Sequence, residues 1–498
     1  MNRKSLLTFL VCFSFLPFLN AQTEYSAYTA VGKGVATTFL TDYQSLGINV
    51  SALGYGTGYS GKRSTIGTTE FSLGMYSPQL TKEGLKNTFQ DIWDAAFKND
   101  KSGFNWDEKR EAAARFVESD FHLNFDYNWL GYSFQSEKFG GIAISVRERY
   151  QFQSKFNETT TDILFRGSLS NYFDSLTIVF GSDTSRIANG NYSQDTLNAV
   201  IEGTASNPLR VSELTDGSRV KFVWNREYNI GYGRKLFGSD SSFALYAGVG
   251  ARFIQSMAMT DFESDGNTVR FHSSTSPSYG IDFGAAAASN PSAYTSSGNM
   301  PSMVGAGYGL DFALSAKFLK VFTVAAAVNN IGAVTYNRNV YTIKDTLVSS
   351  VRLNGLEDFN VTQSVNQLLS DGGLVQAEGQ RKYVVNNPAT IRLGASYKFK
   401  ELLHVGIDVV APFNRDSPGS IKNPVWALGG DIRPLKWLQL SLGFYGGGNY
   451  KAHIPVGINF ILKGGAYEFG FASRDALVFF LKDANSISAA FGFARIRF

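Results

Sequence analysis

The sequence predicts an all-β protein: a transmembrane antiparallel β-barrel of about 14 strands with an N-terminal plug in its lumen and long external loops. Three observations predict this fold class. Apolar and polar residues alternate with period two over segments of about ten residues, short and long connections alternate between these segments, and an export signal precedes them. Strands of a soluble sandwich usually have only about five or six residues.

Composition excludes several other classes. The 498 residues include 50 glycines, 41 Phe and 24 Tyr, and only 18% are charged, which is too aromatic for a disordered chain and too rich in glycine for a helical one. The formal net charge of +4 gives no reason to expect nucleic acid as a partner. The one cysteine, Cys12, lies in the predicted signal, and histidines number only four, so we expect no disulfide, metal site or cofactor.

Residues 1–21 are predicted to be a signal peptide. Arg3 and Lys4 precede an apolar stretch, and Ala21 supplies the small residue that signal peptidase requires. No run of 18 apolar residues follows, so a helix that spans the membrane is not expected. The predicted location is the outer membrane of a Gram-negative bacterium.

Residues 22–62 are rich in glycine, precede the first strand, and must lie either in the periplasm or in the lumen. A barrel of about 14 strands is too wide for its own side chains to fill, so water or polypeptide must occupy its middle. We therefore expect residues 22–62 to form a plug.

Three stretches of this segment resemble the N-terminal signature of the long-chain fatty acid transporter (FadL-type) barrels. They are Gly32-Lys33-Gly34-Val35-Ala36, Asp42-Tyr43-Gln44 and Ile48-Asn49-Val50-Ser51-Ala52-Leu53-Gly54. The resemblance implies a hatch inside a 14-stranded barrel that carries hydrophobic compounds, with a kinked strand that opens sideways. It also implies the plug residues Gly32, Gly34, Asp42, Asn49, Leu53 and Gly54. The whole chain resembles an uncharacterised branch of this family with a helical insert after the first strand.

Residues 63–498 are predicted to form the barrel. After the first strand, residues 80–119 show the three-four apolar spacing of two amphipathic helices, which indicates a helical external insert. Aromatic residues then alternate with polar ones over 121–129, and the pattern recurs to the end of the chain. Weaker stretches at 259–272 and 339–345 would raise the strand count to 16, but we interpret them as hairpin extensions within external loops.

Short links rich in lysine and glycine alternate with longer polar segments. The short links are 136–139, 236–241, 317–320, 398–401, 434–436 and 463–465, and the longest polar segments are 77–119, 155–218, 258–302 and 332–383. Outer-membrane barrels show this asymmetry, with tight turns in the periplasm and long loops outside.

The last strand is typical of outer-membrane barrels. Gly492, Ala494, Ile496 and Phe498 are predicted to share the lipid face, and Arg495 and Arg497 the other. The aromatic end resembles the final strand of proteins inserted by the barrel assembly machinery. Ile496 and Phe498 are therefore the predicted membrane insertion signal, and the assembly machinery and outer-membrane lipid are expected partners.

Five charged residues interrupt the alternation on two neighbouring strands: Arg147, Glu148, Arg149, Arg226 and Glu227. Their parity points Glu148 and Arg226 towards lipid and the other three inward. Because an exposed charge in the middle of the bilayer costs about 2–4 kcal/mol, the pair indicates either a lateral gate, a β-bulge that turns it inward, or a position near the headgroups.

Three function classes remain open. Many small residues predicted to face the lumen favour a passive channel for hydrophobic or amphipathic small molecules. They are Gly248, Gly250, Gly305, Gly307, Gly309, Gly406, Gly443, Gly457 and Gly470. The large external mass favours a structural or secretion-accessory barrel that presents loops to protein partners. The spacing of His272 and Ser274 could serve a lipid hydrolase, but it has no evident acidic partner, so we predict no enzyme and no catalytic residues.

Overall fold

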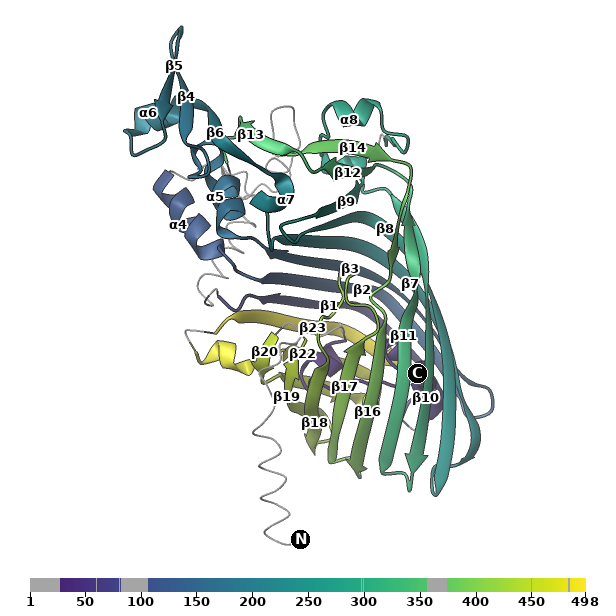
Figure 1. Ribbon diagram of the computed structural model, residues 1–498. Helices are drawn as coiled ribbons and strands as arrows, with labels where there is room; N and C mark the ends of the chain where they lie inside the picture. The colour runs from purple at the N-terminus through teal and green to yellow at the C-terminus, as the bar shows by residue number, and fades with distance from the viewer. Residues whose placement is uncertain are drawn as a thin grey trace.

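Fourteen antiparallel strands form a closed barrel in the computed structural model, which describes residues 27–59, 61–79, 81, 106–296, 298, 300–355, 374–448, 450–481 and 484–498 (Figure 1). The strands are β1 (Ser64–Tyr76), β2 (Phe121–Ser136), β3 (Gly140–Lys155), β7 (Arg219–Ser239), β8 (Phe243–Ser264), β10 (Gly305–Phe318), β11 (Phe322–Tyr336), β16 (Thr390–Phe399), β17 (Leu403–Pro412), β18 (Val425–Leu435), β19 (Leu438–Gly447), β21 (Val456–Leu462), β22 (Tyr467–Ser473) and β23 (Ser486–Arg497). Strand β1 pairs with both β2 and β23, which closes the sheet. The predicted fold class and strand count are confirmed.

The alternation of the sequence places apolar side chains outside the barrel. On β16, for example, Ile391 and Leu393 are exposed, whereas Arg392 between them is fully buried. Successive side chains of a strand point to opposite faces, so one face meets lipid and the other meets the lumen. None of the described helices has the length and apolar composition needed to span a bilayer.

The tight turns lie at one end of the barrel, at the places predicted. The longer loops carry additional strands that extend the wall at the other end: β9 (Val269–Thr275), β12 (Val340–Lys344), β14 (Gln376–Gln380), β15 (Tyr383–Asn386) and β20 (Tyr450–His453). Strand β9 pairs with the far half of β8, and β12 pairs with β9 and β14. The stretches at 259–272 and 339–345 are thus extensions of the wall, and the barrel keeps fourteen strands.

A small external domain stands above this end of the barrel (Figure 1). Its sheet has the order β13 (Leu347–Val351), β6 (Val200–Arg210), β4 (Ser175–Phe180) and β5 (Asp183–Ala188). Residues from two distant loops, among them Ile163, Leu214 and Val348, form its core. The sequence predicted polar loops here. Strands β4, β5 and β6 follow one another in one loop, but β13 comes from a distant loop, and its pairing with β6 leaves no local pattern.

Short helices lie in the connections between the strands, all in the longer loops except one in the tight turn between β21 and β22. They are α4 (Trp106–Phe116), α5 (Glu158–Arg166), η3 (Gly167–Leu169), α6 (Gln194–Asn198), α7 (Val211–Leu214), η4 (Pro277–Tyr279), α8 (Ala285–Ala288), η5 (Lys463–Gly465) and η6 (Ala476–Phe479). Helix α4 lies in the predicted helical insert and packs on α5 through Phe116 and Phe165, whose ring centroids are 5.6 Å apart. The first helix predicted for that insert and the predicted signal peptide lie outside the described residues.

A closed ladder of this length predicts a barrel that resists detergent. Unheated protein in sodium dodecyl sulfate should migrate faster than boiled protein, because the intact barrel is more compact than the unfolded chain. Its circular dichroism spectrum should be dominated by β-structure. A spectrum dominated by helix would contradict the fold.

Candidate functional site

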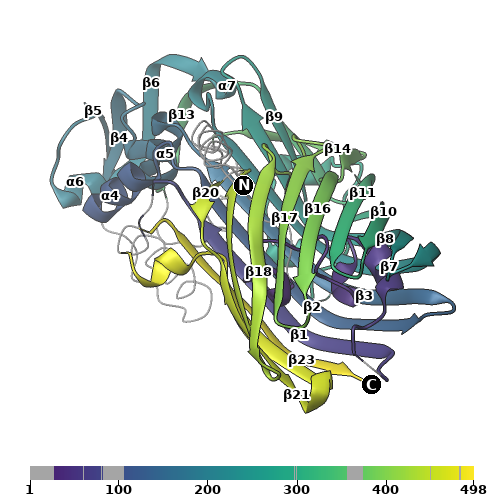
Figure 2. The ribbon, with the colours of Figure 1, turned by 90° about the horizontal axis from the view of Figure 1, so that it is seen from below.

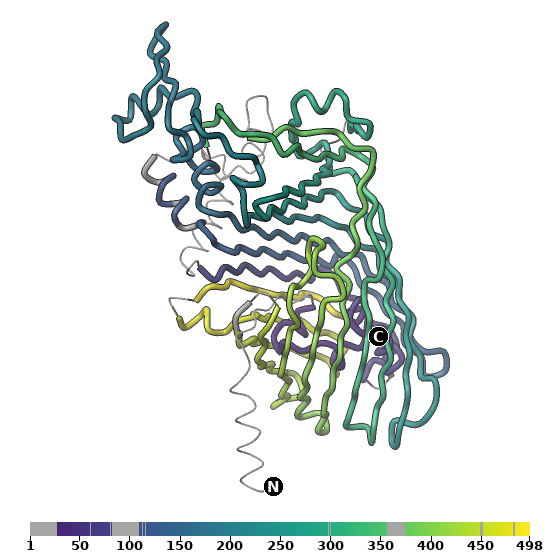
Figure 3. The backbone as a smooth tube through the Cα atoms, viewed as in Figure 1, coloured from purple at the N-terminus to yellow at the C-terminus, as the bar shows by residue number. Residues whose placement is uncertain are grey.

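The N-terminal segment, residues 27–59, lies inside the ring of strands (Figures 2 and 3). It comprises the short helix α2 (Tyr28–Val31) and the 3-10 turns η1 (Tyr43–Ser45) and η2 (Val50–Tyr55). Most of its residues are buried, and it contacts all fourteen barrel strands. Polypeptide thus fills the lumen at this level.

Three of the predicted plug glycines occupy positions where a side chain would not fit. A Cβ atom at Gly32 would lie 2.7 Å from the Cα atom of Gly457 on β21, and one at Gly54 would lie 2.9 Å from the backbone of Arg234 on β7. Gly34 has a φ of 73°, in the left-handed region that favours glycine.

Glycines of the wall make room for the segment in return. Of the nine wall glycines predicted to face the lumen, five border the N-terminal segment: Gly248, Gly250, Gly406, Gly443 and Gly457. The other four border wall residues instead: Gly305, Gly307, Gly309 and Gly470. Five of the nine glycines therefore accommodate the segment and do not widen an open pore.

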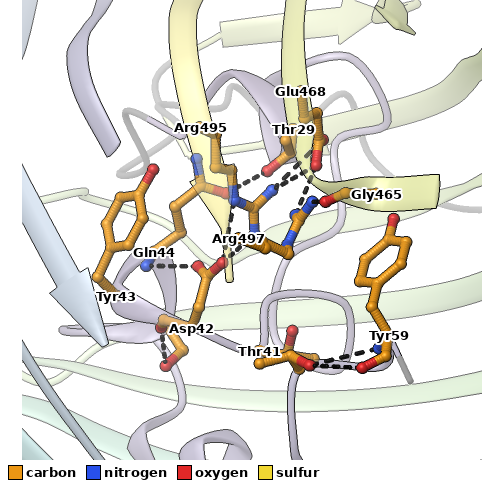
Figure 4. Close-up of polar contacts among 12 residues, drawn as sticks. Thr29, Thr41, Asp42, Tyr43, Gln44, Tyr59, Gly465, Glu468, Arg495 and Arg497 are labelled. Carbon is orange, nitrogen blue, oxygen red and sulfur yellow. Dashed lines mark hydrogen bonds and ion pairs between the residues drawn. The ribbon is translucent and has the colours of Figure 1, made fainter. Parts of the chain in front are cut away.

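Asp42 binds the segment to the last strand. Nε of Arg495 donates to Asp42 Oδ2 at 2.9 Å, and a second nitrogen of the same guanidinium contacts that oxygen. Arg495 also pairs with Glu468 on β22 at 3.3 Å, and Arg497 pairs with Glu468 at 2.5 Å (Figure 4). All four groups are buried, so each compensates the cost of removing its partner's charge from water.

Two further wall carboxylates hold the segment, and sequence reasoning missed both. Asp431 on β18 pairs with Lys33. Asp408 on β17 accepts hydrogen bonds from the backbone N–H groups of Ala36 and Thr37 at 2.7 and 2.9 Å. Both are acidic residues at inward positions of otherwise apolar strands. That pattern is the feature of the sequence from which these two contacts could have been predicted.

Tyr43 and Gln44 bind a carboxylate of the first strand. The Tyr43 hydroxyl donates to Glu70 on β1 at 2.5 Å, and Nε2 of Gln44 donates to the same oxygen at 2.9 Å. Burial, reinforced by the Glu70 charge, raises the pKa of Tyr43 well above its ordinary value, so the phenol stays a donor.

Asn49 and Leu53 fix the second half of the segment. Nδ2 of Asn49 donates to the Thr37 carbonyl at 2.7 Å and to Ser315 on β10 at 3.2 Å. Leu53 is fully buried, and its carbonyl accepts from Gln135 at 3.0 Å, one residue before the end of β2. Turn η2 therefore lies towards the end of the barrel with the tight turns.

The five charged residues of β3 and β7 divide between two faces. Arg147, Arg149 and Glu227 lie inside, where Arg147 donates to Glu227 at 2.6 Å. This inner network continues over neighbouring strands through Asp126, Arg252 and Asp311.

Glu148 and Arg226 pair on the outer face. Their side chains are 2.5 Å apart, with exposed fractions of 5% and 33%. Nε1 of Trp224 also donates to Glu148 at 2.7 Å, and Trp224 stacks on Tyr150 and contacts Tyr279 of an external loop. Backbone pairing of β3 with β7 is continuous from Gly141 to Lys155, so the wall is intact beside this pair.

An open apolar pocket of about 600 Å³ lies elsewhere in the wall, where β21, β22, β23 and β1 meet. Phe71, Ile458, Phe471, Phe479 and Phe491 line it together with small residues. Its lining includes Gly457, Ala472 and Ala490, which contact Gly32 and α2 of the N-terminal segment. One layer of small residues thus separates this pocket from the segment.

The backbone ladder between β22 and β23 is short next to this pocket. Backbone pairing of β22 with β23 ends at Ala472 and Ala490. Beyond that point the contacts involve side chains: the hydroxyls of Ser473 and Ser488 lie 3.2 Å apart, and the Arg474 N–H donates to the Ser488 hydroxyl at 2.7 Å.

The last strand differs from its predicted facing at one residue. Ile496 and Phe498 are exposed outside, and Arg495 and Arg497 are buried inside, as the alternation predicted. Gly492 faces inward against the ring of Tyr28. The cause is a register shift between β22 and β23, where the pairs step from Glu468–Arg495 to Gly470–Gly492.

His272 and Ser274 have separate partners. The ring of His272 stacks on Tyr383 with centroids 3.7 Å apart. Ser274 is fully buried, and its hydroxyl donates to the Arg338 carbonyl at 2.7 Å. This arrangement gives Ser274 no activating base. Within the part of the chain that the structure describes, no cluster of His, Cys, Asp or Glu could hold a metal ion.

Several solved structures are similar to this chain. They include a TodX deltaS2S3 mutant monoaromatic hydrocarbon channel (10% identity over 95% of this chain and 98% of that one, TM-score 0.47). They also include the Pseudomonas putida toluene transporter TodX (10% identity over 97% of this chain and 99% of that one, TM-score 0.41). A Pseudomonas aeruginosa FadL homologue is also similar (9% identity over 97% of this chain and 99% of that one, TM-score 0.38). FadL-type barrels are the family that the N-terminal residues resemble.

Curated proteins and family models give a second comparison. No curated protein matches the chain. One family model, described as a family of unknown function (DUF5723), matches residues 174–464. Since the match covers more than half of the sequence, the chain belongs to the family DUF5723.

Proposed function

We propose that this protein is a passive channel of the outer membrane for hydrophobic or amphipathic small molecules. The apolar pocket between β21, β22, β23 and β1 is the observation that carries the proposal. A general porin needs a water-filled lumen, whereas here the N-terminal segment fills it. A pocket in the wall, backed by that segment, suits a molecule that partitions into lipid.

The pairing of β22 with β23 next to the pocket supports passage of a small molecule through the wall at this place. Separating a backbone ladder breaks many hydrogen bonds together, whereas the contacts of Ser488 with Ser473 and Arg474 are few and local. The ladder between β3 and β7 is continuous. We therefore place the lateral opening at β22 and β23, and assign the Glu148–Arg226 pair a structural role.

Filling the pocket tests this function. Ala489 lines the pocket and is exposed, so Ala489→Trp should obstruct it without touching the N-terminal segment. We expect uptake of a labelled aromatic compound or long-chain fatty acid to fall several-fold relative to wild type, in cells with matched protein levels.

The control makes the same change elsewhere on the lipid face. Ala326 on β11 is exposed, and Ala326→Trp should leave uptake unchanged. Equal uptake by the Ala489→Trp variant and wild type would overturn the place of the opening. Wild-type uptake no greater than that of cells without the protein would overturn the function itself.

The barrel supports the proposed location and partners. The tight turns would face the periplasm and the external domain the outside, with outer-membrane lipid around the apolar wall. The exposed Ile496 and Phe498 would be read by the barrel assembly machinery during insertion.

The external domain favours a second function, the presentation of a surface to protein partners. It has its own hydrophobic core and a four-stranded sheet, more structure than loops of a simple channel need. Co-purification of a stoichiometric partner that is lost when residues 175–200 are deleted would support this function.

A further inference from the structure

The tight turns carry a repeated chemical feature that transport does not use. Five of the six turns contain an exposed lysine, and we call these five residues the rim lysines: Lys138, Lys320, Lys400, Lys436 and Lys463. No ion pair joins any of them to another residue among those the structure describes. The sixth turn, between β7 and β8, contains Asp240, which pairs with Lys235 at 2.9 Å.

Each rim lysine lies next to a large exposed apolar side chain in sequence, or one residue away from it. These side chains are Phe139, Leu319, Leu402, Trp437 and Leu462. An apolar side chain beside an ammonium group is typical of the boundary where the hydrocarbon region meets the headgroups. The rim lysines therefore lie at headgroup level, around the perimeter of the barrel.

The turns carry fewer acidic residues than lysines: Glu137 lies beside Lys138, Glu401 beside Lys400, and Asp240 in the sixth turn. Glu401, beside Lys400, is taken by Lys398 at 2.9 Å and by Arg433 at 3.6 Å. At the other end of the barrel, by contrast with the rim lysines, several basic side chains form ion pairs with acidic residues. Examples are Lys155 with Glu118, Arg270 with Glu263, and Lys344 with Glu378.

We propose that the rim lysines bind the phosphate groups of anionic phospholipids in the periplasmic leaflet. The cations are spread over separate turns around the barrel, so they suit a shell of many headgroups and not one compact anion. Attraction of basic side chains to an anionic leaflet is a general property of membrane surfaces. The inference rests on the proposed function only for the orientation of the barrel in the membrane.

The test measures lipid selectivity directly. Purified protein is reconstituted in phosphatidylethanolamine vesicles, and electron spin resonance measures the association of spin-labelled phosphatidylglycerol and phosphatidylcholine with the barrel. We expect wild type to prefer phosphatidylglycerol several-fold, and the preference to weaken in high salt. Changing all five rim lysines to glutamine should abolish the preference, whereas changing all five to arginine should keep it.

Matched variants keep the result interpretable. Glutamine at the external Lys155, Lys344 and Lys382 should leave the selectivity unchanged, and heat-modifiable migration checks that every variant is folded. Wild type without selectivity, or a glutamine variant that retains it, would overturn the inference. Uptake of the aromatic compound is measured on the same proteins. If wild type prefers phosphatidylglycerol but takes up no aromatic compound, the proposed channel function fails while the lipid inference stands.

Discussion

Deleting residues 27–52 should convert the closed barrel into a water-filled pore. The wall is closed by its own backbone ladder, so it does not need the N-terminal segment to remain a barrel. Without the segment, the glycines that now contact it would border open space, and water would hydrate the inner charged groups. We expect the conductance of single barrels in planar bilayers to rise by about tenfold or more, because a barrel of this strand number is wide.

A second deletion of the same length provides the control. Removing residues 175–200 takes away β4, β5 and part of the external domain but leaves the lumen filled. This variant should conduct no more than wild type. If the deletion of residues 27–52 also left conductance unchanged in a barrel that still migrates as folded, another part of the chain would have to close the lumen.

The barrel could be predicted from sequence because its pattern is local. Each strand shows its own alternation, as Ile391, Arg392 and Leu393 do, and each hairpin joins neighbours in sequence. Because successive side chains point to opposite faces, the side of the sheet on which each residue lies follows from its position along the strand, until a β-bulge shifts the alternation. Near the end of the chain one register shift was enough to turn Gly492 from the predicted lipid face to the lumen.

The parts that sequence reasoning missed depend on contacts between distant segments. Strand β13 pairs with β6 although about 140 residues separate them, so this pairing has no local signature in the sequence. The carboxylates of Asp408 and Asp431 bind residues that lie 372 and 398 positions away in the sequence, so neither contact leaves a local pattern. The pocket is lined by side chains of four strands and a loop, and a pattern of residues within one strand does not encode that geometry.

Replacing Arg495 by methionine should be among the most destabilising single changes in the wall. Arg495 bridges Asp42 of the N-terminal segment and Glu468 of β22, and all three groups are buried. Methionine fills much of the volume but leaves Asp42 without its cation, while Glu468 keeps Arg497. Breaking a buried pair by removing one partner costs about 3–5 kcal/mol. Urea unfolding in detergent should show a loss of this size in the free energy of unfolding.

Two comparisons separate the ion pair from a general effect of the substitution. Arg352→Met removes an arginine from an exposed external pair with Glu202 and should cost less than about 1 kcal/mol. Adding Asp42→Asn to Arg495→Met removes the stranded charge, so the double variant should be more stable than Arg495→Met alone. Two results would contradict this prediction: a double variant less stable than Arg495→Met, or an Arg495→Met variant that loses no more stability than Arg352→Met. In either case the buried charge of Asp42 would not need Arg495 as its partner, and the segment would be held mainly by Lys33, Asp408 and Glu70.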